Sequence, residues 1–321
     1  MSPSNKANGY EMMHESIPII DYSLLTSNNA DERSKAIKDL GNACKDWGCY
    51  KLVNHGVQKS VCQKILNASC EFFNMEKEDK IEFASRDPMN PIAYSNTFNP
   101  TKETKHLASR QALRLTVNPV FHCPHKPQGF SDVVSEYVEK TKVVGLELLK
   151  GISESLGLEA SYMNEELSLE SGYQIFAVNY YPFRSEVDHQ RGMVKHSDHS
   201  FLTLIYENDV PGLEVLCNGE WILMNGVTNG FIVLNGDHLE IFSNGLYKRK
   251  IHRAIMKEEC TRISLVRTYG PSVETIVRPS SRLVDENHPP RYLPKKFGEY
   301  VVDLTRFAIK GRDLFDELRA H

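Results

Sequence analysis

The first half of the chain has the spacing of amphipathic helices. Between residues 31 and 47, apolar side chains recur at steps of three and four with charged residues between them, so one stripe of a helix is apolar. Gly48 ends this helix, and residues 49–53 alternate as a half-buried strand does. Further helices are expected over about 58–75 and about 131–156. In the last of these the apolar stripe is formed by Val134, Val138, Thr141, Val144, Leu148 and Ile152. The pattern predicts an N-terminal region of helices that pack one face on a core.

The second half has the pattern of short strands. From about residue 173, short apolar runs alternate with turn residues. The runs cover residues 176–181, 200–205, 212–216, 220–224, 231–234 and 262–266. Asn218-Gly219 between two runs predicts a hairpin. Many short strands at regular spacing predict a sandwich or a barrel. The earlier stretch 88–127 is rich in Pro, Asn and His and is expected to be an irregular segment of a pocket wall.

Composition excludes several classes of protein. The chain has 321 residues, of which 38 are basic and 42 acidic, without a dense Lys/Arg block, so we expect no nucleic-acid or membrane partner. No apolar run reaches the length of about 18 residues that a transmembrane helix needs. The seven cysteines include no CxxC pair, which argues against a structural zinc site or a disulfide framework. These features favour a cytoplasmic protein.

His196-Ser-Asp198 is the strongest candidate for chemistry. Residues two apart on a strand point to the same face, so this imidazole and this carboxylate can hold one metal ion, with His252 from a later strand as third ligand. Two imidazoles and one carboxylate are typical of non-haem Fe(II) oxygenases. Such a spacing also arises by chance. Arg262 and Ser264 strengthen the hypothesis, because a guanidinium fork beside a hydroxyl suits a carboxylate ligand.

These residues stand within a longer series of motifs that resembles the plant 2-oxoglutarate- and Fe(II)-dependent dioxygenases of the isopenicillin N synthase-like superfamily. The matching motifs follow the family's order over nearly the whole chain. They are Trp47-Gly48, Val53-Asn54-His55-Gly56, Asn179-Tyr-Tyr-Pro182, His196-Ser-Asp-His-Ser200, Leu202-Thr-Leu204, Pro211-Gly-Leu213, Gly219-Glu-Trp221, Gly236-Asp237, Ser243-Asn-Gly245, His252-Arg253 and Arg262-Ile-Ser264. Segments 152–158 and 269–272 are most similar to the branch that serves specialised metabolism and hormone turnover.

The resemblance implies a set of cofactors and a residue for each part of it. By their place in the motifs, the Fe(II) ligands and catalytic residues are His196, Asp198 and His252, and the residues that hold 2-oxoglutarate are Arg262, Ser264, Asn179 and Tyr181. O2 is the second cosubstrate, and ascorbate is the expected reductant. Members of the family couple the oxidative decarboxylation of 2-oxoglutarate, to succinate and CO2, with oxidation of a substrate C–H bond. We therefore expect a 2-oxoglutarate-dependent dioxygenase.

The resemblance also implies the fold. The family has mixed α and β structure, in which a distorted double-stranded β-helix, or jelly roll, is supported by an N-terminal helical buttress and followed by a C-terminal helix. This agrees with the helices and strands predicted above. We expect a mobile tail over residues 1–15, an N-terminal helical region over 16–170, the jelly-roll core over 171–275 and a C-terminal extension with a helix over 276–321.

Side-chain parity and the matching segments indicate the substrate pocket. Its candidate residues are Ala112, Arg114, Ala177, Phe201 and Thr268. Small residues at 112 and 177 leave room for a sizeable, largely apolar plant metabolite such as a terpenoid, a lignan or another phenolic, which the enzyme would hydroxylate, desaturate or cyclise. His199 would face the opposite side of an ideal strand from the triad and is left out. We expect a monomer whose partner is this small molecule.

Two alternatives remain open. An oxidase of the same superfamily that uses no 2-oxoglutarate would have the same iron ligands, and stoichiometric release of succinate distinguishes the two. A catalytically silent receptor would use the cavity of the same fold to bind a small molecule. The intact triad and Arg262 argue against a receptor, which needs neither a redox-competent metal site nor an anion clamp.

Overall fold

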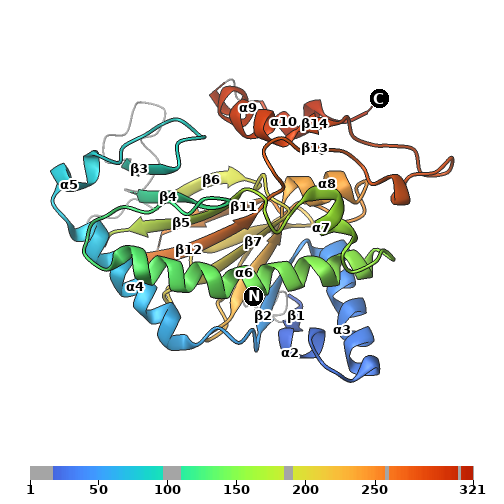
Figure 1. Ribbon diagram of the computed structural model, residues 1–321, viewed down its shortest axis with the longest axis horizontal. Helices are drawn as coiled ribbons and strands as arrows, with labels where there is room; N and C mark the ends of the chain where they lie inside the picture. The colour runs from blue at the N-terminus through green and yellow to red at the C-terminus, as the bar shows by residue number, and fades with distance from the viewer. Residues whose placement is uncertain (1–16, 97–109, 184–190, 257–259, 310–311, 321) are drawn as a thin grey trace, which may run out of the picture.

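The structure is a computed structural model that describes residues 17–96, 110–183, 191–256, 260–309 and 312–320. Two sheets face each other, and helices cover the outer face of the larger sheet (Figure 1). The expected tail over residues 1–15 lies outside the described residues. The prediction of mixed α and β structure is confirmed. Within the described ranges, no helix combines the length and the apolar composition needed to cross a bilayer.

The larger sheet has eight strands in the order β1–β2–β10–β7–β12–β5–β4–β3. They are β1 (Ile19–Asp21), β2 (Cys49–Val53), β3 (Ile92–Asn96), β4 (Gln111–Asn118), β5 (Gln174–Tyr181), β7 (Leu202–Glu207), β10 (Phe231–Asn235) and β12 (Arg262–Tyr269). Neighbouring strands are antiparallel, except that β1 and β2 are parallel. Most side chains of β5, β7 and β12 are buried, because helices cover one face of these strands and the second sheet covers the other.

The smaller sheet has four strands in the order β6–β11–β8–β9. They are β6 (Arg191–His196), β8 (Leu213–Cys217), β9 (Glu220–Leu223) and β11 (His252–Ile255). The hairpin predicted between two runs is confirmed as the β8–β9 connection. Its turn residues Asn218 and Gly219 have φ angles of 50° and 86°, and a two-residue hairpin turn with both φ values positive matches the twist of the strands.

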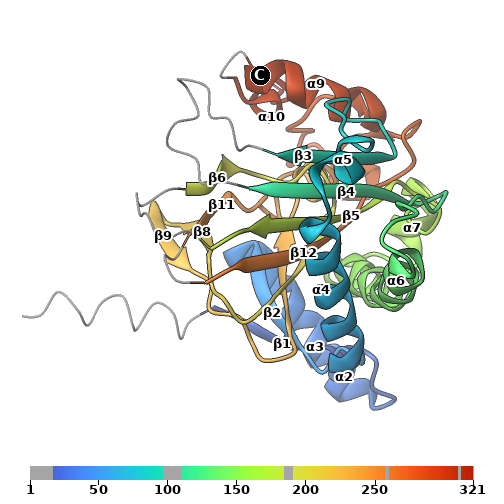
Figure 2. The same ribbon diagram turned by 90° about the vertical axis from the view of Figure 1, so that its left-hand side faces the viewer.

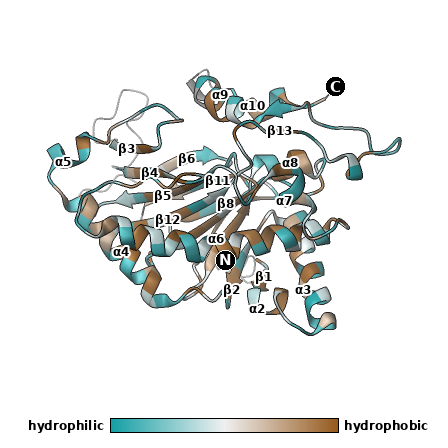
Figure 3. Cartoon of the chain, in the orientation of Figure 1, coloured by the Kyte–Doolittle hydropathy of each residue, from teal (hydrophilic) through white to brown (hydrophobic). Residues whose placement is uncertain are grey.

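Three long helices support the larger sheet from one side (Figures 1 and 2). They are α3 (Ala30–Asn42), which continues as a π-helix over Ala43–Trp47, α4 (Lys59–Asn74) and α6 (Phe130–Ser155). Figure 3 shows apolar and polar residues alternating around α3, as an amphipathic helix requires. All six residues of the stripe predicted for α6 are buried. Gly145 lets α6 approach β12 closely, because a Cβ atom there would lie 2.1 Å from the ring of Tyr269.

The N-terminal region contains more strands than expected, in addition to the strand expected over residues 49–53, which is confirmed as β2. It contributes the strands β1 to β4 to the larger sheet, and two of them, β3 and β4, lie within the segment 88–127 that was expected to be irregular. Leu113, Leu115 and Val117 of β4 do alternate with polar residues, but this short run was missed within a segment whose Pro, Asn and His content indicated irregular structure. The boundaries of the regions stay a prediction.

The remaining elements are short, apart from one C-terminal helix. They are α2 (Tyr22–Leu25), α5 (Lys77–Ile81), α7 (Tyr162–Leu167), α8 (Asp237–Phe242), β13 (Ile276–Val277), a 3-10 turn (Ser281–Leu283), β14 (Lys295–Lys296), α9 (Phe297–Ile309) and α10 (Leu314–Glu317). The expected C-terminal helix is α9. It is tied to α8 by the Tyr300 hydroxyl, which donates a hydrogen bond of 2.7 Å to Oδ2 of Asp237.

Candidate metal centre and cavity

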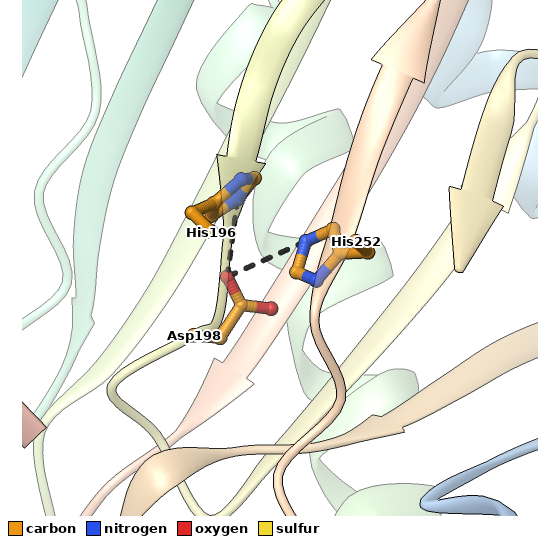
Figure 4. Close-up of side chains that lie close together, drawn as sticks. All are labelled: His196, Asp198 and His252. Carbon is orange, nitrogen blue, oxygen red and sulfur yellow. Dashed lines mark ion pairs between the residues drawn. The ribbon is translucent and has the colours of Figure 1, made fainter. Parts of the chain in front are cut away.

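Three potential metal ligands converge at one end of the smaller sheet. His196 is the last residue of β6, and Asp198 lies two residues beyond the end of this strand. His252 is the first residue of β11, directly opposite His196 in the ladder. The Asp198 Oδ1 atom lies 3.7 Å from Nε2 of His196 and 3.8 Å from Nε2 of His252 (Figure 4). The ligand atoms of all three side chains lie within 4.8 Å of one another. The predicted triad is therefore assembled in the fold.

Hydrogen bonds orient both imidazoles for metal binding. Nδ1 of His196 lies 2.9 Å from the carbonyl oxygen of Val194, and Nδ1 of His252 lies 3.1 Å from that of Lys250. A carbonyl can only accept, so Nδ1 carries the proton in each ring and Nε2 keeps its lone pair. Both lone pairs are on the nitrogen that is close to Asp198, and this tautomer is the one that a metal ligand requires.

A hydrogen bond also orients the carboxylate of Asp198. The Thr203 hydroxyl, on β7 of the opposite sheet, donates a hydrogen bond of 2.6 Å to Oδ2 of Asp198. Ser200 lies 3.2 Å from the Thr203 hydroxyl. Since the Thr203 proton is directed at the carboxylate, Ser200 is the donor of that second bond. Oδ2 is thereby occupied, and Oδ1 is left for a cation.

The protonation states also suit a cation. Burial and the nearby charge of His252 lower the pKa of His196 to about 4, so this imidazole is neutral at neutral pH. Burial alone would raise the pKa of Asp198, but His252, His196 and the Thr203 hydroxyl outweigh it and lower that pKa. Two imidazoles and one carboxylate form the donor set of non-haem Fe(II) sites. The residues present fit that metal.

A cavity of about 220 Å³ opens beside the triad, between the two sheets. On the larger sheet it is lined by alternate residues of β5 and β12, the parity that the sequence predicts. The lining residues are Arg110, Arg114, Ile175, Ala177, Asn179, Tyr181, Met193, His196, Asp198, His199, Ile205, Leu213, His252, Arg253, Ala254, Arg262, Ser264, Val266 and Thr268. The cavity has a polar end around Arg262 and an apolar wall farther along the same strands.

The polar end has free capacity for an anion. Arg262 is 2% exposed, and its Nε and Nη1 atoms have no hydrogen-bond partner among the described residues, while Nη2 pairs with Glu207. Its guanidinium lies 5.2 Å from the ring of Tyr181. Beside it, the Asn179 amide donates a hydrogen bond of 3.2 Å to the Ser264 hydroxyl. Buried donors without an acceptor are costly, so this end of the cavity fits the carboxylate of a ligand.

Most of the residues predicted for the site line this cavity, and two of them do not. The triad, the four residues expected to hold 2-oxoglutarate, and the substrate candidates Arg114, Ala177 and Thr268 are in the lining. Ala112 is buried in β4 opposite Asn179 but is outside the lining. Phe201 is also outside it: the ring is fully buried and packs against Phe242 and His238, because Phe201 precedes β7 and is not held in its alternation.

Besides Arg253 and several apolar lining residues, four further residues that belong to the site or support it were not predicted. His199 and Arg110 line the cavity, and Thr203 and Glu207 hold Asp198 and Arg262. His199 is not part of the triad, but it lines the cavity and does not face away from it, because β6 ends at His196 and strand parity does not extend beyond that residue. Thr203 and Glu207 share the parity of the cavity residue Ile205 on β7, but the sequence offered no recognised ligand on that strand to fix which face is inward.

The fold and the site together define a non-haem Fe(II) oxygenase of the 2-oxoglutarate-dependent class. Residues 172–271 match the family model described as the 2OG-Fe(II) oxygenase superfamily, and residues 17–133 match that described as the non-haem dioxygenase in morphine synthesis N-terminal. The rice (Oryza sativa subsp. japonica) protein 2-oxoglutarate-dependent dioxygenase 19 is 38% identical over 319 residues, 99% of this chain and 94% of that protein. The chain belongs to the 2-oxoglutarate-dependent dioxygenases, and Fe(II) and 2-oxoglutarate are the cofactors of this family.

Other similar proteins confirm the fold, and their names refer to several different small molecules. Rice flavanone 3-dioxygenase 3 is 30% identical over 99% of this chain and 97% of that protein. The crystal structure of JOX2 in complex with 2OG, Fe and JA is 28% identical, with a TM-score of 0.79 over 88% of this chain and 83% of that one. The rice dioxygenase for auxin oxidation has a TM-score of 0.79 at 23% identity, a likeness of fold alone. These structures confirm the predicted jelly-roll core.

Proposed function

We propose that the protein oxidises a C–H bond of a small, largely apolar plant metabolite, with Fe(II) bound by His196, Asp198 and His252. The observation that carries this proposal is one cavity that contains both the triad and the unpaired donors of Arg262. Bound iron supplies the O2-dependent oxidation chemistry of the family. 2-Oxoglutarate is oxidatively decarboxylated with O2 to succinate and CO2, and the organic product is hydroxylated, desaturated or cyclised. Ascorbate would serve to keep the metal reduced.

The residues of the polar end bind the cosubstrate in this proposal. Arg262 has unpaired donors at Nε and Nη1 and donates to the carboxylate of 2-oxoglutarate that is remote from the metal. The Ser264 hydroxyl donates to the same group. Ser264 already accepts a bond from Asn179, which leaves its own proton for the ligand. Tyr181 packs beside the guanidinium and limits the directions in which it can turn. These contacts orient the cosubstrate and exclude water from the anion-binding end.

The substrate lies against the apolar wall in this proposal. Ile175, Ala177 and Val266 form that wall on the larger sheet, and Met193 and Leu213 face it from the smaller one. A terpenoid, a lignan or another phenolic has the apolar surface that such a wall stabilises. The relatives named as flavanone 3-dioxygenases, and the JOX2 complex with JA, support a small organic substrate rather than a macromolecule. We further propose that the protein is a monomer in the cytoplasm.

The test is an untargeted search for turnover. The purified protein is incubated with Fe(II), ascorbate, 2-oxoglutarate and a plant extract, and mass spectrometry follows compounds that gain one oxygen or lose two hydrogens. We expect such a product together with an equimolar amount of succinate, and neither with Asp198→Ala. Oxidation of a compound without succinate would favour the 2-oxoglutarate-independent oxidase. Saturable binding of an extract compound without any turnover by the parent protein would favour the receptor.

A further inference from the structure

Arg114 places a cation at the edge of the apolar wall. In the ladder of the larger sheet it lies opposite Ala177, which lies opposite Val266, which in turn lies opposite Ile205. All four residues line the cavity. The row across β4, β5, β12 and β7 is therefore apolar along most of its length and ends in a guanidinium. A ligand that covers this row would have an apolar body with one end at Arg114.

The bonds of Arg114 leave its charge uncompensated. Its Nη2 donates to the carbonyl oxygens of Asp87 at 3.1 Å and Asn90 at 3.0 Å, and its Nη1 donates to the hydroxyl of Tyr173 at 3.3 Å. All three acceptors are neutral. Among the described residues, no carboxylate oxygen lies within 4.0 Å of a guanidinium nitrogen of Arg114, so none forms an ion pair with it. A guanidinium has five N–H donors, so the three bonds fix its position and leave two donors for a ligand.

Two other arginines of the cavity differ in this respect. Arg253 forms an ion pair of 2.5 Å with Glu214, and Arg262 pairs with Glu207. A half-buried cation that the protein does not neutralise is an affinity site for an anionic group of a ligand.

We propose that Arg114 binds a carboxylate of the organic substrate, so that the substrate is an amphiphilic acid whose apolar body covers Ala177 and Val266. This inference rests on the proposed function and narrows its substrate class. The contact fixes one end of the molecule and thereby decides which of its carbons is closest to the metal. Arg262 is reserved for the dicarboxylate, and Arg114 is the specificity-determining residue for the second acid.

The test compares an acid with its neutral ester. Protein loaded with Mn(II) and saturating 2-oxoglutarate, which occupies Arg262, is titrated with 2-naphthoate or with methyl 2-naphthoate, and binding is followed by the fluorescence of the naphthalene. We expect the acid to bind at least about tenfold more tightly than the ester, since hydrogen bonds to a charged group contribute factors of about 10 to 100. Arg114→Gln should remove this preference without changing the affinity for the ester, and Arg114→Lys should retain part of it.

A second measurement uses the natural mixture. The plant extract is divided by anion exchange into a retained acidic fraction and an unretained neutral fraction, and each is incubated with the active enzyme. We expect products only from the acidic fraction. An equal affinity for acid and ester, an unchanged preference in Arg114→Gln, or turnover confined to the neutral fraction would overturn the inference. The affinity of the parent protein for 2-oxoglutarate is measured alongside. If the protein binds 2-oxoglutarate but shows no preference for the acid, only the role of Arg114 is wrong. If it does not bind 2-oxoglutarate, the proposed function itself fails.

Discussion

Glu207 and Arg262 form a buried ion pair on the neighbouring strands β7 and β12, with side chains 5% and 3% exposed. Only Nη2 of Arg262 takes part, and the second oxygen of Glu207 has no partner among the described residues. Burial raises the pKa of Glu207 more strongly than Arg262 lowers it. The ion pair itself partly neutralises the guanidinium of Arg262 before any cosubstrate binds. The carboxylate of an incoming dicarboxylate then lies close to the carboxylate of Glu207.

Removing that charge should strengthen the binding of 2-oxoglutarate. Glu207→Gln keeps an oxygen that accepts from Arg262 but no longer repels the cosubstrate. We expect the dissociation constant of 2-oxoglutarate to fall about fivefold, which corresponds to about 1 kcal/mol of relieved repulsion. Calorimetric titration of the Mn(II)-loaded protein measures this. Glu214→Gln, which changes the acid of the Arg253 pair, is the matched control and should leave the constant unchanged. Weaker binding in Glu207→Gln would contradict the argument.

Thr203 should determine how well the triad holds a metal. Thr203→Val is nearly isosteric and removes the hydroxyl that orients Asp198. We expect the affinity for Mn(II) to fall about tenfold or more, since losing a hydrogen-bond partner of a metal ligand has effects of that size. The change is followed by Mn(II) titration of the metal-free protein. Ser200→Ala is the control, because it removes a buried hydroxyl of the same cluster but keeps the bond to Asp198. Equal losses in both variants would point to a general packing effect.

Side-chain parity explains why much of the cavity could be predicted from the sequence. Arg262 and Ser264 on β12, and Asn179 and Tyr181 on β5, lie on regular strands, so residues two apart share a face and all four line the cavity. Val266 and Thr268 continue that face along β12. Once the strands were recognised, one known position on each was enough to assign its inward face.

Parity is uninformative where the backbone bends or where a partner comes from another sheet. Phe201 and His199 follow the end of β6, and their orientation depends on a bend that the sequence pattern does not reveal. Glu207 accepts a hydrogen bond from Arg262, which is 55 residues farther along the chain. Thr203, on the larger sheet, donates a hydrogen bond to Asp198, which follows a strand of the smaller sheet. The first contact depends on which strands are neighbours in the sheet, and the second on how the two sheets face each other. Both are properties of the tertiary structure.

Arg267 points away from the cavity and should be important for stability. It is fully buried, and it joins α6 to β5 through donors to Thr141 at 3.2 Å, to the carbonyl oxygen of Ile175 at 2.9 Å and to Gln174 at 3.0 Å. Arg267→Met leaves these buried acceptors without a donor. We expect the free energy of unfolding to fall by about 3 kcal/mol, measured by urea denaturation.

The control for Arg267 is an arginine that also links helix α6 to another element but is more exposed. Arg33 pairs with Glu154 at 2.5 Å, and its side chain is 33% exposed. Arg33→Met should cost about 1 kcal/mol or less, because solvent screens exposed ion pairs. Similar losses for the two variants would mean that the bonds of Arg267 contribute no more than a surface pair does.

Gly212 should control the position of Arg262. A Cβ atom at this residue would lie 2.6 Å from Nε of Arg262 and 2.7 Å from the carbonyl oxygen of Ile255, which is backbone and cannot move away easily. The guanidinium must therefore shift in Gly212→Ala. We expect the dissociation constant of 2-oxoglutarate to rise about tenfold, in line with the loss of a charge-assisted hydrogen bond, while the affinity for Mn(II) stays the same because the triad is untouched.

The matched control for this substitution is Gly226→Ala. Gly226 lies near Glu207, and a Cβ atom there would come no closer than 3.9 Å to it, an ordinary contact distance. This variant should bind 2-oxoglutarate as the parent does. If Gly212→Ala also bound it normally in the same calorimetric titration, Arg262 could not be the group that holds the cosubstrate, because its guanidinium cannot keep its place beside the added methyl group.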